Sequence, residues 1–227
     1  MSEKQYTSII DTPKSANEED LLGIDKYKKG LVRFIENTRT PITVAIQGEW
    51  GSGKTSLMNT LKDDLCDQVG KRFIPIWLNT WQYSLMKEPD EALISIIKGL
   101  TDEVLAIVDD GKSDVSKKVR NVFGKVLKAS AQLAVSATTG QDVSGVMDAM
   151  SSSKELTILD LRNALNEAIK SILEKEKKDG FIFFIDDLDR IDPPMAVQIL
   201  ELLKNIFDLD NCVFVLAIDY DVVIKGL

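Results

Sequence analysis

Short apolar runs alternate with amphipathic stretches along this chain, a pattern that is typical of α/β proteins. Four of the runs predict buried strands, at residues 42–46, 73–78, 181–185 and 212–218. Such runs favour a parallel sheet, because helices cover both faces of a parallel sheet and its strands are apolar on both sides. Apolar residues at helical spacing predict helices near residues 21–35, 57–65, 89–104, 157–173 and 193–207.

Prolines mark several of the predicted boundaries. Pro41 biases Thr40 away from helix and ends the first helix before the first strand. Pro75 suits a strand at the edge of the sheet, because proline cannot donate to a hydrogen-bonded ladder. Pro89 and Pro193 suit the first turn of the helices that they open. Between the second strand and the next helix, the simplest interpretation of residues 79–83 is a loop with aromatic anchors.

The pattern divides the chain into four segments. Residues 1–20 are polar, and we expect a mobile tail there. Residues 21–107 and 154–227 contain the predicted strands and form the two parts of one core. Residues 108–153 have a different character because 129–141 are small and uncharged, so we expect an insertion that is partly helical, partly loose and soluble.

A glycine-rich stretch separates the first predicted strand from the next helix. It fits the pattern G-x-x-x-x-G-K-[ST], whose backbone N–H groups converge on phosphates. Lys54 would reach the β- and γ-phosphates, and the Thr55 hydroxyl would hold Mg²⁺. The alternative is a plain turn between strand and helix. The candidate nucleotide-binding residues are Gly48, Glu49, Trp50, Gly51, Ser52, Gly53, Lys54, Thr55 and Ser56.

The third predicted strand ends in two carboxylates. Asp186 would hold Mg²⁺ through its water shell, and Asp187 would orient or deprotonate an attacking water. The alternative is a solvated acidic turn. Arg190 is a candidate cation for the γ-phosphate, with a salt bridge to Asp189 or a neighbour as the alternative. Asp219, after the fourth strand, would face the same crevice or cap the next helix.

Composition narrows the function classes. The net charge of −8 argues against broad binding to nucleic acid or anionic membranes. The chain contains no histidine, which excludes histidine-based triads and metal sites. Cys66 and Cys212 lack metal-ligand spacing and are expected to pack in the core. No signal peptide and no apolar run of about 18 residues occurs, so we expect a cytoplasmic protein, with weak surface association through the basic residues 117–128 as an option.

At this point the sequence resembles the KAP P-loop NTPases. The resemblance rests on four motifs, at residues 48–56, 79–81, 185–190 and 213–219, and extends over residues 11–227 except the insertion. It implies an NTPase core of the additional-strand type with strand order 5-1-4-3-2, in which the Asp186 strand is third. It also implies ATP with Mg²⁺, a segment at residues 11–27 that covers the adenine, and Asn79 and Trp81 near the nucleotide.

The sequence departs from this family's pattern in two places. Many members carry transmembrane helices where residues 108–153 lie, and members continue after the Asp219 strand into a fifth strand and a helical lid. Without a fifth strand, the strand at 42–46 would expose one edge, so we expect the 227-residue chain to be aggregation-prone or dimeric and to be part of a longer protein.

The leading prediction is a Mg²⁺-dependent ATPase that acts as a conformational or assembly switch, with a protein partner or a second copy of the chain. By analogy with prokaryotic members of the family, the switch would serve phage exclusion or a signalling complex. The alternative is a scaffold that signals by nucleotide occupancy and hydrolyses negligibly. A phosphotransferase with a small acceptor is disfavoured, because the pair Asp186 and Asp187 suits water as the acceptor.

Overall fold

The computed structural model describes residues 23–68, 70–84, 89–107, 113–125, 144–204 and 208–226. Among these residues, four parallel strands form one sheet in the order β1-β4-β3-β2. The strands are β1 (Ile42–Gln47), β2 (Phe73–Asn79), β3 (Gly180–Asp186) and β4 (Cys212–Ile218). The predicted parallel sheet and the order 1-4-3-2 are thereby confirmed.

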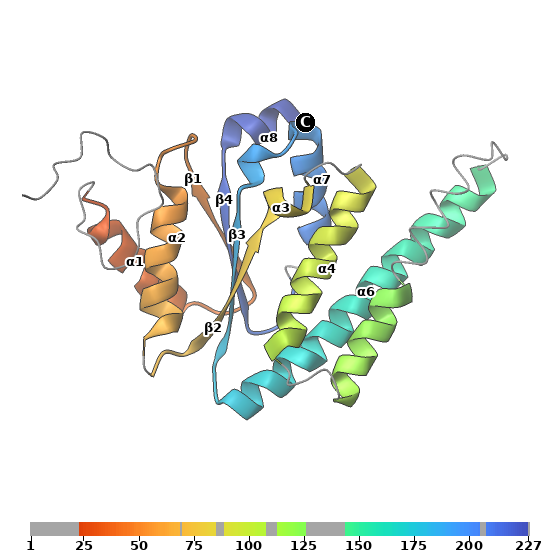
Figure 1. Cartoon of the computed structure of the whole chain (residues 1–227), viewed down its shortest axis with the longest axis horizontal. Helices are drawn as coiled ribbons and strands as arrows, with labels where there is room; N and C mark the ends of the chain where they lie inside the picture. The colour runs from red at the N-terminus through yellow and green to blue at the C-terminus, as the bar shows by residue number, and fades with distance from the viewer. Residues whose placement is uncertain are drawn as a thin grey trace, which may run out of the picture.

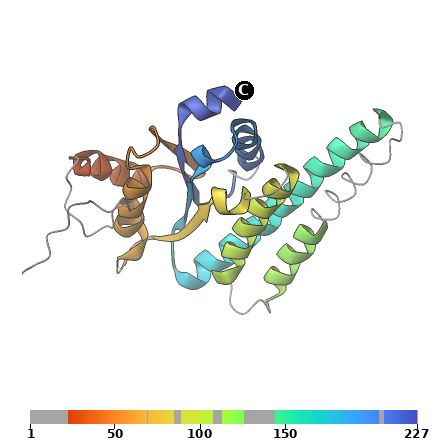
Figure 2. The ribbon, with the colours of Figure 1, turned by 45° about the horizontal axis from the view of Figure 1, so that its top comes forward.

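Helices cover both faces of the sheet (Figure 1). One layer contains α1 (Asp25–Asn37), α2 (Lys54–Lys62) and the π-helical turn η1 (Asp63–Asp67). The other contains α4 (Pro89–Ile107), α6 (Ser144–Glu176) and α7 (Pro193–Lys204). The short helices α3 (Thr80–Ser84), η2 (Leu188–Arg190) and α8 (Tyr220–Gly226) follow the carboxyl ends of β2, β3 and β4. A helix at residues 114–125 runs beside α6, as Figure 2 also shows.

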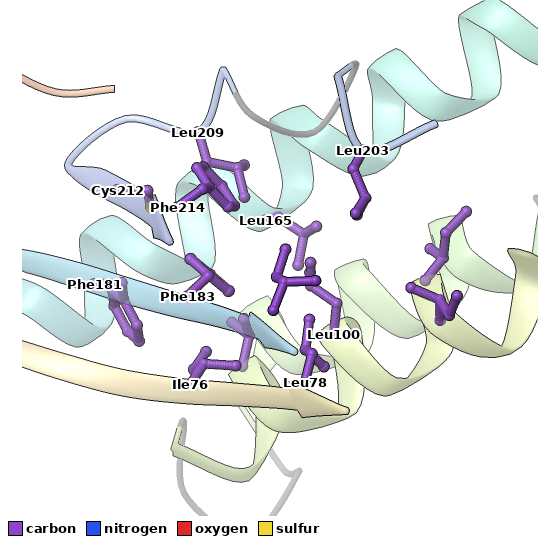
Figure 3. Packing of buried hydrophobic residues seen from close by; sticks show 14 of the residues in the cluster. Ile76, Leu78, Leu100, Leu165, Phe181, Phe183, Leu203, Leu209, Cys212 and Phe214 are labelled. Carbon is purple, nitrogen blue, oxygen red and sulfur yellow. The ribbon is translucent and has the colours of Figure 1, made fainter. Parts of the chain in front are cut away.

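Strand β3 is the centre of the fold, and all its residues are buried. Its side chains alternate between two apolar clusters, since successive residues of a strand point to opposite faces. Phe181, Phe183 and Ile185 face α4, α6 and α7, where Phe183 stacks on Phe214 at 4.9 Å (Figure 3). Phe184 faces α1 and α2 and stacks on Trp77 at 5.4 Å.

The two edges of the sheet differ in their side chains. Pro75 lies on β2, which pairs with β3 alone among the described residues, so the predicted edge position is correct. Within the same residues β1 pairs only with β4, and Thr43, Ala45 and Gln47 of β1 are exposed. The association expected from this edge stays a prediction.

Two predictions about the helices are wrong. Residues 80–84 form the helix α3 instead of a loop, because the side chain of Asn79 accepts a hydrogen bond from the backbone of Gln82 and so caps the turn. Helix α6 begins at Ser144, ahead of the predicted residue 157. Within the predicted insertion, residues 114–125 are helical, and Val119 is fully buried in the core, so this part is packed.

Two other expectations concern residues that lie entirely outside the described ones. The polar tail at 1–20 and the small, uncharged run at 129–141 belong to this group. In the part of the chain that is described, no helix combines the length and the apolar character needed to cross a bilayer. Both cysteines are free and buried, and burial raises the pKa of the Cys66 thiol to about 12.

We predict that Gly180→Ala lowers the free energy of unfolding by about 1–3 kcal/mol, the usual cost of overpacking a core. Gly180 opens β3, and an added Cβ would lie 2.4 Å from the backbone oxygen of Asn211. Chemical denaturation measures the change. Gly30→Ala is the matched control, because nothing lies within 4 Å of its Cβ and alanine favours helix α1. Wild-type stability of Gly180→Ala would contradict this account of the strand.

Candidate functional site

The loop between β1 and α2 is shaped by two glycines with positive φ. Gly51 has a φ of 79° and Gly53 a φ of 88°, a region that other residues rarely adopt. The amide of Gly48 donates to the carbonyl of Ile218 at the end of β4 over 3.2 Å, which ties the loop to the sheet. The glycine spacing of the sequence is therefore needed for the turn itself.

Lys54 lies at the first residue of α2, directly after this turn. Its side chain folds back over the loop, where its Nζ donates to the carbonyl of Gly48 over 2.8 Å and to that of Glu49 over 3.0 Å. The same Nζ lies 2.8 Å from Oδ2 of Asp189. The amino end of α2 and the Lys54 ammonium both bring positive charge to this loop, and the Asp189 carboxylate offsets part of it.

Asp186 faces the loop from the last position of β3. Its side chain accepts hydrogen bonds from the Thr55 hydroxyl and, over 2.9 Å, from the backbone of Asp187. The Thr80 hydroxyl donates to the Asp186 carbonyl over 2.8 Å and fixes the backbone there. Asp186 is 4% exposed. Burial raises its pKa; the two hydrogen bonds act in the opposite direction, and the charges of Asp187 and Asp189 add to the rise.

Asp187 lies where the chain turns out of the sheet. Its φ is 62°, in the left-handed region that aspartate tolerates better than most residues. Asn79 donates to Oδ2 over 2.5 Å, and Arg190 lies 2.6 Å from Oδ1. Both carboxylate oxygens of Asp187 therefore have partners, one from β2 and one from η2.

Arg190 is a partner of this carboxylate and of an aromatic ring. Its guanidinium lies over the ring of Trp81 at 5.6 Å from the centroid, a cation–π distance. The salt bridge weighed for Arg190 from the sequence thus forms with Asp187, while Asp189 pairs with Lys54. The motif at 79–81 and the motif at 185–190 meet through these contacts.

The candidate site residues surround a cavity of about 240 Å³. Its lining consists of Trp50, Gly51, Gly53, Lys54, Thr55, Ser56, Asp186, Asp187, Asp189 and Arg190. Trp50 is 77% exposed at the rim. Gly48, Glu49 and Ser52 belong to the loop without lining this cavity.

Asp219 is not among the residues that line this cavity. Its Oδ1 accepts from the Asp221 amide over 3.0 Å, and its carbonyl accepts from Val223, so it caps α8. The sequence pattern assigns no role of its own to Asp189, although this residue lines the cavity. The available signal was a third carboxylate within the run at 186–190.

The residues present suit a hard divalent cation that is shared with phosphates. Thr55 and Asp186 offer a hydroxyl and a carboxylate side by side, which is the kind of oxygen pair that Mg²⁺ uses when phosphates and water supply its other ligands. Among the described residues, no group of three or more histidine, cysteine, aspartate or glutamate side chains could hold a metal by itself.

The fold and this loop define a P-loop domain. A family model described as "KAP family P-loop domain" matches residues 24–227, so the chain belongs to the KAP family of P-loop NTPase domains. Membership confirms the resemblance noted in the sequence and indicates nucleotide binding, with hydrolysis of the nucleotide as the reaction associated with the class.

Two curated relatives match a short part of the chain. Over 64 residues the chain is 31% identical to "Kinase D-interacting substrate of 220 kDa" from Homo sapiens and to the protein of the same name from Rattus norvegicus. The matched segment is 27% of this chain and 4% of each relative. The match therefore covers a small part of each relative and about a quarter of this chain.

We predict that Asp186→Asn raises the thermal midpoint at neutral pH in the absence of divalent metal by roughly 2–4 °C. Because its pKa is raised in the folded state, Asp186 holds a proton more tightly there than in the unfolded chain, and its charged form costs stability above that pKa. The cost disappears as the pH falls through the folded-state pKa towards the ordinary value of 3.8.

Differential scanning calorimetry between neutral and acidic pH checks this sign. The gain from Asp186→Asn should shrink as the pH falls, since the protonated wild-type carboxyl then resembles the amide. Asp208→Asn is the control, because its exposed carboxylate meets only the surface side chain of Arg162 among the ion pairs of the described residues. A gain that grows towards low pH would contradict the prediction.

Proposed function

We propose that this domain binds ATP with Mg²⁺ and hydrolyses it. The observation that carries the proposal is the meeting of Lys54 and Thr55 with Asp186 and Asp187 around one cavity, although the two pairs lie more than a hundred positions apart in the sequence. In-line attack on a γ-phosphate requires chiefly positioning and neutralisation of charge, and these side chains are of the types that supply both.

Each residue has a separate role in this proposal. Lys54 and the amino end of α2 bind the phosphates. Thr55 and Asp186 hold Mg²⁺, which neutralises phosphate charge when it is bound. Asp187 orients the attacking water and accepts its proton, and Arg190 leaves Asp187 to contact the γ-phosphate.

Asn79 positions Asp187 for this role. Its Oδ1 is held by the backbone of Gln82 at 3.3 Å, so its amide nitrogen points to Oδ2 of Asp187. Because Asn79 and Asp186 are register partners in neighbouring strands, the sheet itself fixes this geometry.

The biological use of the reaction is also part of the proposal. We propose that ATP, rather than GTP, drives a conformational or assembly switch that acts on a protein partner or a second copy of the chain. Family membership supports the nucleotide chemistry. The name of the human relative describes a protein that interacts with kinase D, which favours a protein as partner. A role in phage exclusion or signalling rests on analogy within the family.

A second candidate function is a switch that responds to nucleotide occupancy with negligible hydrolysis. It is favoured by one observation, namely that both oxygens of Asp187 are already engaged by Asn79 and Arg190. Asn79 and Arg190 each occupy one side of this carboxylate, so Asp187 is less accessible to an attacking water while Arg190 stays in place. Single-turnover hydrolysis of bound ATP distinguishes the two functions.

We predict that Lys54→Ala weakens ATP binding by at least about a hundredfold, the effect of truncating one member of a close charge pair. The fold should persist, because the loop geometry depends on glycines. Titration with a fluorescent ATP analogue measures affinity, and circular dichroism checks folding. Lys62→Ala is the control, since Lys62 ends the same helix and pairs with Asp67 at the surface. Unchanged affinity in folded Lys54→Ala would remove the central claim.

We predict different effects for the two adjacent carboxylates. Asp187→Asn should retain Mg·ATP binding and slow single-turnover hydrolysis by at least about tenfold, as expected for loss of a general base. Asp186→Asn should instead weaken the part of ATP binding that depends on Mg²⁺. Binding with and without EDTA, together with rapid-quench hydrolysis, separates these effects. Equal changes in binding and turnover for both variants would show that the roles are not separate.

A further inference from the structure

Protein oxygens surround the ammonium group of Lys54. It has two backbone acceptors, the carbonyls of Gly48 and Glu49, and a third oxygen, Oδ2 of Asp189, lies at 2.8 Å. The side chains of Lys54 and Asp189 are only 7% and 6% exposed. A lysine ammonium has three donors, so these neighbours fill its surroundings.

The contact between Lys54 and Asp189 is an ion pair without the geometry of a hydrogen bond. Oδ2 of Asp189 is buried and, among the described residues, has no hydrogen-bond partner of acceptable angle, although the Lys54 nitrogen lies at ion-pair distance. The positive charge of Lys54 is therefore what offsets the burial of this oxygen. Removing that charge would leave a buried carboxylate oxygen unpaired, which is strongly unfavourable.

The position of Asp189 is fixed by the turn that carries it. Leu188 on one side is 2% exposed, and Ile191 two residues later is 5% exposed. Both belong to the apolar cluster beneath α4, α6 and α7. The carboxylate of Asp189 is thus presented to Lys54 by a turn that is anchored in the core, and not by a long surface side chain.

A carboxylate oxygen beside an ammonium at this distance makes the same kind of electrostatic contact that a phosphate oxygen would make. Asp189 and the phosphates of a bound nucleotide would therefore compete for the ammonium group of Lys54. Asp189 also lines the same cavity as the phosphate loop. For a phosphate to reach Lys54, the ion pair with Asp189 must open.

The geometry points to Asp189 as an internal competitor of nucleotide phosphates, whose carboxylate holds Lys54 until a diphosphate or triphosphate takes its place. The inference rests on the proposed function and adds a residue that sets its affinity. The apparent affinity is the intrinsic affinity multiplied by the fraction of molecules in which Lys54 is not paired with Asp189. A nucleoside monophosphate, which lacks the β- and γ-phosphates, gains little from opening the pair.

The first experiment tests the ion pair by thermal unfolding without added nucleotide. Lys54→Met should lower the midpoint by several degrees, because it leaves Asp189 buried and unpaired. Adding Asp189→Asn to Lys54→Met should raise the midpoint again, which is the signature of coupling between the two residues. Asp208→Asn in the same background is the control and should leave the midpoint unchanged. A further fall in the Lys54→Met/Asp189→Asn variant overturns the proposal.

The second experiment measures affinities for ATP, ADP and AMP by calorimetry in EDTA, with the full chain. Asp189→Asn should tighten ATP and ADP binding by about tenfold and AMP binding much less. Asp208→Asn, which removes an exposed carboxylate outside the site, measures the general effect of losing one negative charge. Equal gains in Asp189→Asn and Asp208→Asn, or weaker ATP binding in Asp189→Asn, overturn the competitor role.

The two proposals fail in different ways. If neither the wild type nor Asp189→Asn binds ATP with or without Mg²⁺, the proposed function is wrong, and the competitor role falls with it. If the wild type binds ATP and Asp189→Asn binds it no more tightly, the competitor role alone is wrong. ATP binding that appears only in Asp189→Asn supports both.

Discussion

The pairing of buried charges at the carboxyl end of β3 is the interaction on which the site depends. Asp186, Asp187 and Asp189 lie together there, and Lys54 and Arg190 face them as cations. Among the ion pairs of the described residues, Asp186 has no cationic partner, and hydrogen bonds from a hydroxyl and an amide stabilise its charge. A divalent cation shared with phosphates would offset the negative charge of Asp186. A nucleotide-binding role therefore explains this cluster of charges better than a role in stability alone.

The parallel sheet explains how such a cluster can exist in a folded protein. Because β3 is central and buried on both faces, its last residue is held by the core and lines the cavity. The neighbouring strands contribute from the same edge, since β2 ends at Asn79 beside Asp186, and the end of β4 holds the loop at Gly48. The core therefore supplies the rigidity that closely spaced charges require.

Much of this architecture could be predicted from the sequence. The apolar runs of β3 and β4 and the glycines at 51 and 53 each have one physical explanation, burial in a parallel sheet or a positive φ. The pairing of carboxylates with cations could not be predicted in the same way. It depends on the left-handed turn at Asp187, which sends Asp189 to Lys54 and Arg190 back to Asp187. Asp219 was likewise ambiguous, because a strand-end aspartate can cap a helix or face a crevice.

The turn η2 links the proposed phosphate contacts to the rest of the domain. Its residues Asp189 and Arg190 hold Lys54 and Asp187, so one short segment touches both the group proposed to bind phosphate and the group proposed to orient water. The same turn contacts α3, β4 and α7, and α8 packs on α7. Exchange of Asp189 for a phosphate at Lys54 would therefore act first on η2 and next on α7 and α8. Tyr220 and Ile224 of α8 are half exposed, at 53% and 51%, so this helix presents apolar side chains at the surface where a change in η2 could be recognised.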